Sequence, residues 1–397
     1  MRGVCMLVTN RGFDDPRVCM EAEALADSGR RVTVVGWDRD VDRTATLRQR
    51  NVDFLRLHLR STHGRGVTQT AFVAGFWCRA WAALRRLRPG VIHCHDLDTL
   101  PVGWLAARSL RAHLVFDAHE NFPDMMAGHL PAPAVAALRG LERFCLPRCD
   151  LVITVGQRLA EHLRRTGART VAIVGNWKHP DAYRFAPEAV RKVREDLSLP
   201  DGTVAVCYIT NLGPERRLEA LLAAVAADRR FACVVGGDGP QADLARKYAA
   251  AHRNVTYLGR VPPDRVPLIT ASCDVIYSGY DQAKPNAHWG APNKMYEAIA
   301  AGKPLLANDF GEIGEVVRTE GCGVLADTDS ADSIAEGLNR LADGPTRAEM
   351  GRRAAGLQRR FCRDRANASL LDAYRRLGGT RPSAGAAPAP STQEAEA

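Results

Sequence analysis

The sequence has no long apolar segment. No stretch approaches the ~20 residues that a helix needs to span a bilayer. The first nine residues hold only a short apolar run, V-C-M-L-V, before the chain turns polar, which is unlike a secretory signal. We therefore expect a cytoplasmic protein, with peripheral contact at the inner membrane face as an open alternative.

Paired cysteines are also absent. The eleven cysteines are scattered singly, without C-x-x-C pairs or histidine partners at metal spacing, which predicts reduced, mostly buried thiols and no metal site. Lysine is scarce, at six of the 54 basic residues, so the net charge of +9 comes mainly from arginine. Such a positive field attracts anionic substrates such as nucleotide diphosphates. The sequence contains no nucleic-acid-binding module, so we expect no nucleic-acid partner.

The sequence does contain a regular alternation of short apolar runs with helical stretches, which predicts parallel sheets covered by helices. In the first half we expect strands at 4–8, 31–37, 52–57, 91–95, 113–117, 151–155 and 170–174. A second series follows at 204–210, 231–235, 255–258, 275–277, 304–307 and 323–325. The pattern loosens at 177–200, where we place a hinge. The expected units are Rossmann-like domains at 1–180 and 181–355, a helix at 356–377 and a disordered tail at 378–397.

The segment A-P-N-K-M-Y-E, which starts at Ala291, is the strongest functional motif. Asn293 is a candidate N-cap, and the backbone amides of the helix that follows suit a phosphate or a sugar hydroxyl. Lys294 in the first turn opposes the helix dipole and so suggests a bound anion. Glu297, one turn on, can accept hydrogen bonds from both hydroxyls of a ribose. The alternative is an ordinary capped helix with a solvated lysine.

The strand-to-helix turn N-L-G-P-E-R-R, from Asn211 to Arg217, is the second candidate. Gly213 allows a tight turn after the strand. Arg216 and Arg217 then lie at a helix start, where cations are mildly unfavourable unless they bind an anion such as a diphosphate. The alternative is a surface arginine pair.

Polar residues also end two strands of the first domain. V-F-D-A-H-E ends in His119 and Glu120, at the sheet edge that faces the ligand crevice in such folds. The preceding strand ends in H-C-H-D-L-D. Its D-L-D resembles a metal-binding D-x-D, but Asp98 can simply cap the next helix, so no metal is expected. Glycines in G-G-D-G-P, from Gly236, permit close approach of a ligand or form a plain turn.

Together these segments resemble the retaining family-4 glycosyltransferases over residues 4–377. The resemblance rests on seven motifs in order: D-D-P-R-V, V-I-H-C-H-D, V-F-D-A-H-E, I-T-N-L-G-P-E-R-R-L, V-V-G-G-D-G-P, V-T-Y-L-G-R-V and A-P-N-K-M-Y-E-A-I-A-A-G-K-P. It implies the GT-B fold, an α/β architecture of two Rossmann-like domains whose parallel sheets face each other across a cleft. A C-terminal helix would return to the first domain. It also implies sugar transfer from a nucleoside-diphosphate sugar, with retention of configuration and no metal or other cofactor.

The resemblance also assigns residues. The predicted catalytic residues are His119, which contacts the donor sugar, Arg216, which binds its phosphates, and Glu297, which binds the ribose. The remaining predicted donor contacts are Asn211, Gly213, Arg217, Arg260, Trp289, Asn293 and Lys294, with Arg260 at the base.

Three of these positions depart from the family pattern. Asn211 replaces a usual arginine, Arg217 replaces a common glycine, and Trp289 stands where a glutamate often binds the sugar. Since an indole cannot accept such hydrogen bonds, we expect a modified sugar or a site in which Asn293 and Lys294 take over its contacts.

The predicted function is therefore transfer of a sugar to a small-molecule or lipid-linked acceptor by a monomer or homodimer. The missing arginine and glutamate leave open a nucleotide-sugar epimerase or a non-glycosidic coupling enzyme. A further alternative is a non-catalytic membrane-associated scaffold, because residues 72–87 are amphipathic and basic. The plainer interpretation of that segment is a helix packed on its sheet.

Overall fold

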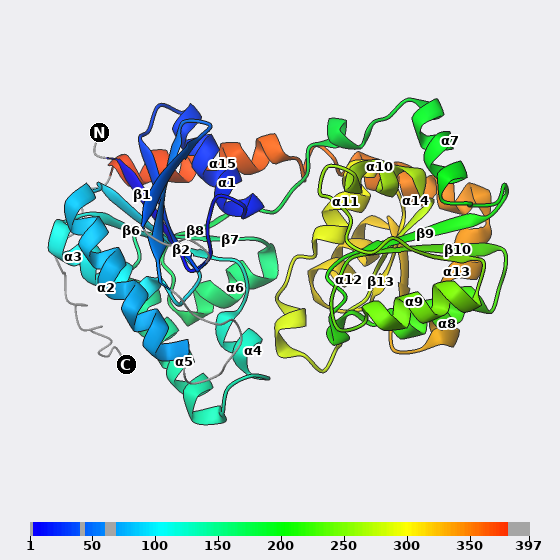
Figure 1. Cartoon of the computed structure of the whole chain (residues 1–397), viewed down its shortest axis with the longest axis horizontal. Coiled ribbons are helices and arrows are strands. Elements are labelled where there is room, and N and C mark those ends of the chain that lie inside the picture. The colour runs from blue at the N-terminus through cyan, green and yellow to red at the C-terminus, as the bar shows by residue number, and fades with distance from the viewer. Residues whose placement is uncertain (1–2, 40–43, 60–68, 380–397) are drawn as a thin grey trace, which may run out of the picture.

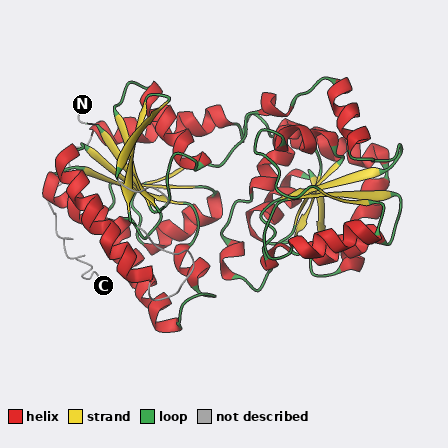
Figure 2. Ribbon diagram, viewed as in Figure 1, coloured by secondary structure: helices red, strands yellow, loops and turns green. Residues whose placement is uncertain are grey.

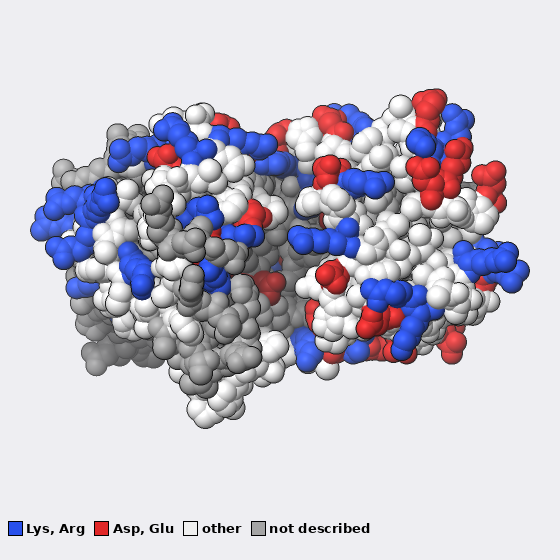
Figure 3. All heavy atoms as spheres, viewed as in Figure 1, with Lys and Arg blue, Asp and Glu red and all other residues white. Residues whose placement is uncertain are grey.

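The computed structural model describes residues 3–39, 44–59 and 69–379. Within these ranges the chain forms two α/β domains that lie side by side (Figure 1). Helices cover both faces of each sheet (Figure 2), and the space-filling view shows a groove between the domains (Figure 3). The predicted fold class is confirmed, and every predicted strand is present within one residue of its expected ends.

The first sheet has the order β3-β4-β2-β1-β5-β6-β7-β8. Its strands are β1 (Val4–Val8), β2 (Val32–Asp38), β3 (Ala45–Gln49), β4 (Val52–His58), β5 (Val91–His95), β6 (His113–Ala118), β7 (Leu151–Thr154) and β8 (Val171–Ile173). All neighbouring pairs are parallel except β3 with β4. The apolar runs form central strands because both faces of a parallel sheet are buried. Strand β3, an exposed edge strand of sequence A-T-L-R-Q, was not among the predicted strands.

Helices bury apolar side chains on both faces of this sheet. One face packs α1 (Pro16–Asp27) and α15 (Arg363–Gly379), and the other packs α2 (Gln69–Leu87), α3 (Leu100–Leu110) and α6 (Gln157–Thr166). The short helix α4 (Phe122–Met126) and then α5 (Ala132–Cys145) with η2 (Leu146–Arg148) follow β6.

The second sheet has the order β11-β10-β9-β12-β13-β14, and all its pairs are parallel. Its strands are β9 (Val204–Ile209), β10 (Phe231–Gly236), β11 (Val255–Tyr257), β12 (Val275–Ser278), β13 (Leu305–Asn308) and β14 (Gly323–Ala326). One face packs α8 (Leu218–Ala226), α9 (Ala242–Ala251) and α13 (Ala331–Ala342). The other packs α7 (Pro187–Asp196), α10 (Val266–Ser272), α11 (Asn293–Ala301), α12 (Gly311–Glu320) and α14 (Gly344–Gly356).

The chain crosses between the domains twice. It leaves the first domain after β8 through η3 (Pro180–Tyr183), and it returns between α14 and α15. A parallel bridge joins the two crossings at Lys178 and Cys362, and Phe361 packs on Trp177 with ring centroids 5.6 Å apart. Helix α15 then packs on α1 and β8, so the last helix belongs to the first domain. Helix α15 continues to Gly379, two residues into the predicted tail, and the rest of that tail, 380–397, lies outside the described residues.

Helix α2 contains the segment for which membrane contact was considered. Its apolar side chains contribute to the core of the first domain, where Phe76 and Leu84 are buried and Trp81 is partly buried. Arg85 and Arg86 are exposed on its outer side. This is the arrangement of a helix packed on its sheet, and membrane contact stays a prediction. Among the described residues, no helix is both long enough and apolar enough to cross a bilayer. All eleven cysteines fall in the described ranges and are free thiols.

Candidate active site

An ion pair anchors the polar edge of the first sheet. Asp117, at the end of β6, accepts two hydrogen bonds from the guanidinium of Arg17, at 2.6 and 2.9 Å, and both side chains are buried. Arg17 also donates to the Val174 carbonyl at 2.7 Å. It stands in the first turn of α1, whose N-cap Asp15 accepts from backbone amides. Buried arginine–carboxylate pairs with two parallel hydrogen bonds have a fixed geometry, so this pair holds the end of β6 in place.

His119 lies between two carboxylates at this edge. Its Nε2 is 2.8 Å from Asp117 Oδ2, and its Nδ1 is 3.5 Å from Asp96 Oδ2. Burial opposes its positive charge, but Asp96 and Asp117 outweigh burial and raise the pKa of His119 to about 9. Asp96 has a φ of +60°, a backbone conformation that costs energy for a residue with a side chain and that clusters at functional sites. His119 is therefore a cation at neutral pH.

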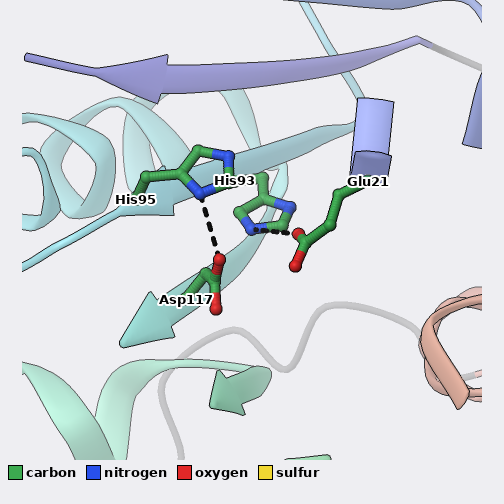
Figure 4. A group of neighbouring side chains, drawn as sticks. All are labelled: Glu21, His93, His95 and Asp117. Carbon is green, nitrogen blue, oxygen red and sulfur yellow. Dashed lines mark hydrogen bonds and ion pairs between the residues drawn. The ribbon is translucent and has the colours of Figure 1, made fainter. Parts of the chain in front are cut away.

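Behind His119 lies a buried group of side chains from three elements: Glu21 from α1, His93 and His95 from β5, and Asp117 from β6 (Figure 4). Their ligand atoms lie within 4.8 Å of one another, as in metal sites. However, Arg17 contacts both carboxylates, at 2.6 Å from Asp117 and 3.0 Å from Glu21. Because this guanidinium already supplies the balancing charge, we interpret the group as an internal ion-pair network rather than a metal site.

Arg216 is a cation of the second domain at the turn after β9, in the short helix η4 (Pro214–Arg216). Its guanidinium lies 4.5 Å from the centre of the Tyr280 ring. Its Nε is buried and makes no hydrogen bond within the described residues, although Glu215 lies 3.4 Å away. An unsatisfied buried donor on a cation favours an anionic ligand.

The other predicted residues of this turn have other surroundings. Arg217 has a φ of +48° and forms ion pairs with Asp281, at 2.6 Å, and with Asp329. It thus holds this loop to two neighbouring loops. Asn211 is exposed. Gly213 has an ordinary φ of −73°, so the turn does not require glycine for its backbone, although a Cβ there would meet the Glu215 carboxylate at 2.3 Å.

The N-cap of α11 is not Asn293, as the sequence predicted. Pro292 is the N-cap, and Asn293 is the first helical residue. Pro292 takes the cap because its fixed φ suits the extended residue before a helix, and the Asn293 side chain instead accepts a hydrogen bond from Lys178 at 3.2 Å. Lys294 and Glu297 are both buried and form an ion pair with each other. The predicted phosphate-binding lysine and ribose-binding glutamate are therefore adjacent and paired.

Contacts across the groove bring the two edges together. Asn286 of η5 (Pro285–His288) donates to Glu120 at 2.6 Å and accepts from the Asn121 amide at 3.2 Å. Trp289 does not turn toward its own domain. Its indole donates to Asp124 at 2.7 Å and packs against the core of the first domain. Arg260, in contrast, is exposed, and the structure gives it no contact with these residues.

A third contact across the groove joins two helix starts. Glu312, in the first turn of α12, accepts from the backbone amide of Arg158 in α6 at 3.3 Å. Gly156, the N-cap of α6, has no side chain to do this, and a Cβ there would lie 2.1 Å from the Glu312 carboxylate. A residue of one domain thus satisfies orphan amides of the other.

Sequence reasoning missed Arg17, Glu21, Tyr280 and Asn286. Arg17 stands in the quoted motif D-D-P-R-V, which was a usable signal, whereas no sequence pattern marks Tyr280 or Asn286. The assembled site offers a cation from each domain, Arg216 from the second, whose charge reaches Glu120, and protonated His119 from the first. Such an arrangement stabilises a departing anion. A hollow of about 630 Å³ lies elsewhere, among α12, β14, α13 and α14.

Comparisons with known proteins agree with this geometry. Residues 15–177 match the glycosyl transferase 4-like domain, and residues 190–356 match the glycosyl transferases group 1. The 2-deoxystreptamine glucosyltransferase of Streptomyces kanamyceticus is 26% identical over 309 residues, which cover 73% of this chain and 77% of the relative. The D-inositol 3-phosphate glycosyltransferase of Salinispora tropica is 27% identical over 331 residues, which cover 77% of this chain and 67% of the relative.

Two solved structures show the same fold. Sucrose-phosphate synthase of Thermosynechococcus elongatus superposes with a TM-score of 0.79 at 17% identity, over 96% of this chain and 100% of that structure. Anabaena HepE, solved with UDP and glucose, superposes with a TM-score of 0.72 at 18% identity, over 95% of this chain and 100% of that structure. The fold, the cationic groove and both family matches lead to one conclusion: this chain belongs to the family-4 glycosyltransferases of the GT-B fold.

Proposed function

We propose that the chain transfers a sugar from a nucleoside-diphosphate sugar to a small hydroxylated acceptor, with retention of configuration and without a metal ion. The observation that carries this proposal is Arg216, a partly buried cation whose Nε is buried and has no hydrogen-bond partner in the described part of the chain. Burial raises the pKa of Glu120, and Arg216 is close enough to this carboxyl for its charge to offset part of that rise. Arg216 therefore stands at the groove, where the donor phosphates would lie.

The Lys294–Glu297 pair suggests how the donor is held. A diphosphate attracts the Lys294 ammonium, and this frees the Glu297 carboxylate to accept from the ribose hydroxyls. Trp289, whose indole is bonded to Asp124, offers the sugar no acceptor. The Anabaena neighbour, solved with UDP and glucose, supports a uridine nucleotide as the first donor to test.

The transfer step requires stabilisation of a departing diphosphate. The bond between the anomeric carbon and the phosphate oxygen breaks, and the acceptor oxygen attacks that carbon from the same face. The acceptor proton passes to the leaving phosphate oxygen, so no side chain is needed as a general base. Arg216, Lys294 and protonated His119 offset the growing negative charge, which is the role of preorganised cations in such a site.

A polar cavity of about 300 Å³ is the proposed acceptor site. It begins at Asn121, two residues after His119, and its walls include the buried Glu142 carboxylate and the His162 ring. Carboxylates and amides bind hydroxyl and amino groups better than they bind a lipid chain. The S. kanamyceticus and S. tropica relatives are named for a cyclitol amine and an inositol phosphate, which agrees with a small polar acceptor.

Release of UDP from UDP-sugars in the presence of cyclitol acceptors tests the proposal. Arg216→Ala and Glu297→Ala should each lower kcat by about 10²- to 10³-fold, as loss of a preorganised charge-stabilising group does. Arg246→Ala, which removes an exposed arginine of the same domain, is the control and should keep full activity. Near wild-type rates for both site variants would disprove the site, and an inverted anomeric centre in the product would disprove retention.

A further inference from the structure

The last helix of the chain places a hydroxyl beneath the candidate active site. Tyr374 of α15 is buried, with 2% of its surface exposed, and its hydroxyl lies 2.8 Å from Nδ1 of His93. These two residues are 281 positions apart, with the whole second domain between them in sequence. The first domain is therefore complete only when the C-terminal helix has docked.

The second nitrogen of His93 faces Glu21. His93 Nε2 lies 3.5 Å from Glu21 Oε2, and the two side chains are wholly buried (Figure 4). Neither oxygen of Glu21 makes a hydrogen bond within the described residues, and its other close partner is Arg17, at 3.0 Å. A carboxyl group that is buried with so few partners lowers the stability of the folded state, which points to a role other than stability.

Arg17 is shared between two carboxylates. It makes the two hydrogen bonds to Asp117 described above and lies beside Glu21 on the same helix face. Asp117 Oδ2 in turn accepts from His119 at 2.8 Å. When Glu21 is neutral, the positive charge of Arg17 balances the charge of Asp117 alone. When Glu21 is ionised, the same guanidinium balances two carboxylates. Five contacts thus lead from Tyr374 through His93, Glu21, Arg17 and Asp117 to His119.

We propose that Glu21 and Tyr374 are positioning residues for sugar transfer, which act through Arg17 and Asp117 on the charge and orientation of His119. This inference rests on the proposed function, because it assumes that His119 serves the donor. Neither residue touches the substrate. In this proposal the Tyr374 hydroxyl is the donor to Nδ1 of His93, so the N–H of that ring lies on Nε2, faces Glu21 and holds the carboxyl beside Arg17.

The charges around Glu21 set the direction of its effect. The groups that face it come from every neighbouring element: Arg17 and Asp15 at α1, His93 from β5, Asp117 and His119 at β6, and Tyr374 from α15. Burial and the charge of Asp117 raise the pKa of Glu21 to about 8, against the effect of Arg17. Glu21 is therefore mostly neutral at pH 7 and ionised near pH 9, where His119 titrates. There its negative charge helps His119 to keep its proton.

Two variants and a matched control test the proposal. Tyr374→Phe removes only the hydroxyl that bonds to His93. Ser369→Ala removes a hydroxyl from the same helix, which donates to the Ile173 carbonyl at 2.8 Å and does not touch the network. Tyr374→Phe should lower kcat for UDP-sugar turnover about 5-fold, the equivalent of one buried hydrogen bond, with the donor KM unchanged. Ser369→Ala should leave both constants unchanged.

Glu21→Gln tests the electrostatic step without any substrate. His119 is titrated by NMR in histidine-labelled full-length protein, with its signal identified by its loss in His119→Gln. In Glu21→Gln no carboxylate forms near pH 9, so the pKa of His119 should fall by about half a unit or more. A retained thermal transition shows that each variant is folded.

Three results would overturn the proposal: equal losses of kcat in Tyr374→Phe and Ser369→Ala, a loss in Tyr374→Phe that appears only in the donor KM, or an unchanged His119 titration in Glu21→Gln. Failure of the proposed function is separable from these results. A wild-type protein that turns over no UDP-sugar disproves that function, whereas the NMR titration still decides whether Glu21 acts on His119.

Discussion

Replacement of Arg17 by methionine should destabilise the first domain strongly. The change leaves Asp117 buried without its guanidinium, and it also removes the partner of Glu21 and a donor to the Val174 carbonyl. Breaking a buried ion pair from one side costs about 3–5 kcal/mol, because the remaining charge is uncompensated. We expect the free energy of unfolding of Arg17→Met to fall by about that amount at pH 7.

The assay is urea unfolding followed by circular dichroism, with Arg352→Met as the control. Arg352 pairs with Glu349 at 2.6 Å on the surface, where such pairs contribute less than about 1 kcal/mol. The deficit of Arg17→Met should shrink at pH 5. In the wild type the charge of Arg17 overcomes burial and holds the pKa of Asp117 well below its usual range, so Asp117 stays ionised at pH 5. In the variant Asp117 is free to take up a proton.

A double-mutant cycle with Asp117→Asn decides whether the pair itself carries the effect. If the two changes are coupled by more than about 2 kcal/mol, the ion pair is the cause. Additive effects, or a loss in Arg17→Met no larger than that in the surface control, would refute the reasoning.

Three further predictions concern the groove and the site. Trp289→Phe removes the hydrogen bond to Asp124 of the first domain but keeps an aromatic ring, so an open form, in which the two domains have moved apart, should gain about 1 kcal/mol relative to the form described here; small-angle scattering would then show a larger radius of gyration, and an unchanged radius would count against the contact. Transfer should weaken as pH rises through about 9, because His119 has a raised pKa and loses its positive charge there; a flat rate from pH 8 to 10 would exclude a role for that charge. Incubation with EDTA, followed by gel filtration, should leave the rate of UDP release unchanged, and recovery only on adding a divalent ion would contradict a metal-free reaction.

The fold could be predicted because most of its strands are short apolar runs that stand out in the sequence. Apolar runs such as Val4–Val8 and Phe231–Gly236 are buried at every position, and burial on both faces of a sheet favours a continuous apolar sequence. β3 could not be predicted, because an exposed edge strand needs no apolar face. The cap of α11 was assigned to Asn293 from residue preference, but the preceding proline already supplies the extended backbone of a cap.

The candidate site residues could be identified from the sequence within each domain, but not the contacts between distant segments. Arg216, Lys294 and Glu297 lie in motifs that follow strands of one sheet, and the ends of parallel strands meet at one edge. Pairings across long separations left no local signal, as for Arg17 with Asp117 or Tyr374 with His93. Indole chemistry shows that Trp289 has no hydrogen-bond acceptor to offer, and the structure adds that its N–H donates to Asp124 of the first domain.

Because Glu312 bonds across the groove, any movement from this closed form to an open form with separated domains is linked to proton binding. Burial in the closed groove raises the pKa of Glu312 to about 7, although backbone amides of α6 favour its charged form. In an open molecule the same carboxyl faces water and titrates near its ordinary value of about 4.5. Between these two values the closed form holds more protons than the open form, so closing takes up protons from a near-neutral solution. Acidification from pH 8 to pH 6 should therefore shift the population toward the closed form, and scattering curves at the two pH values would reveal that shift.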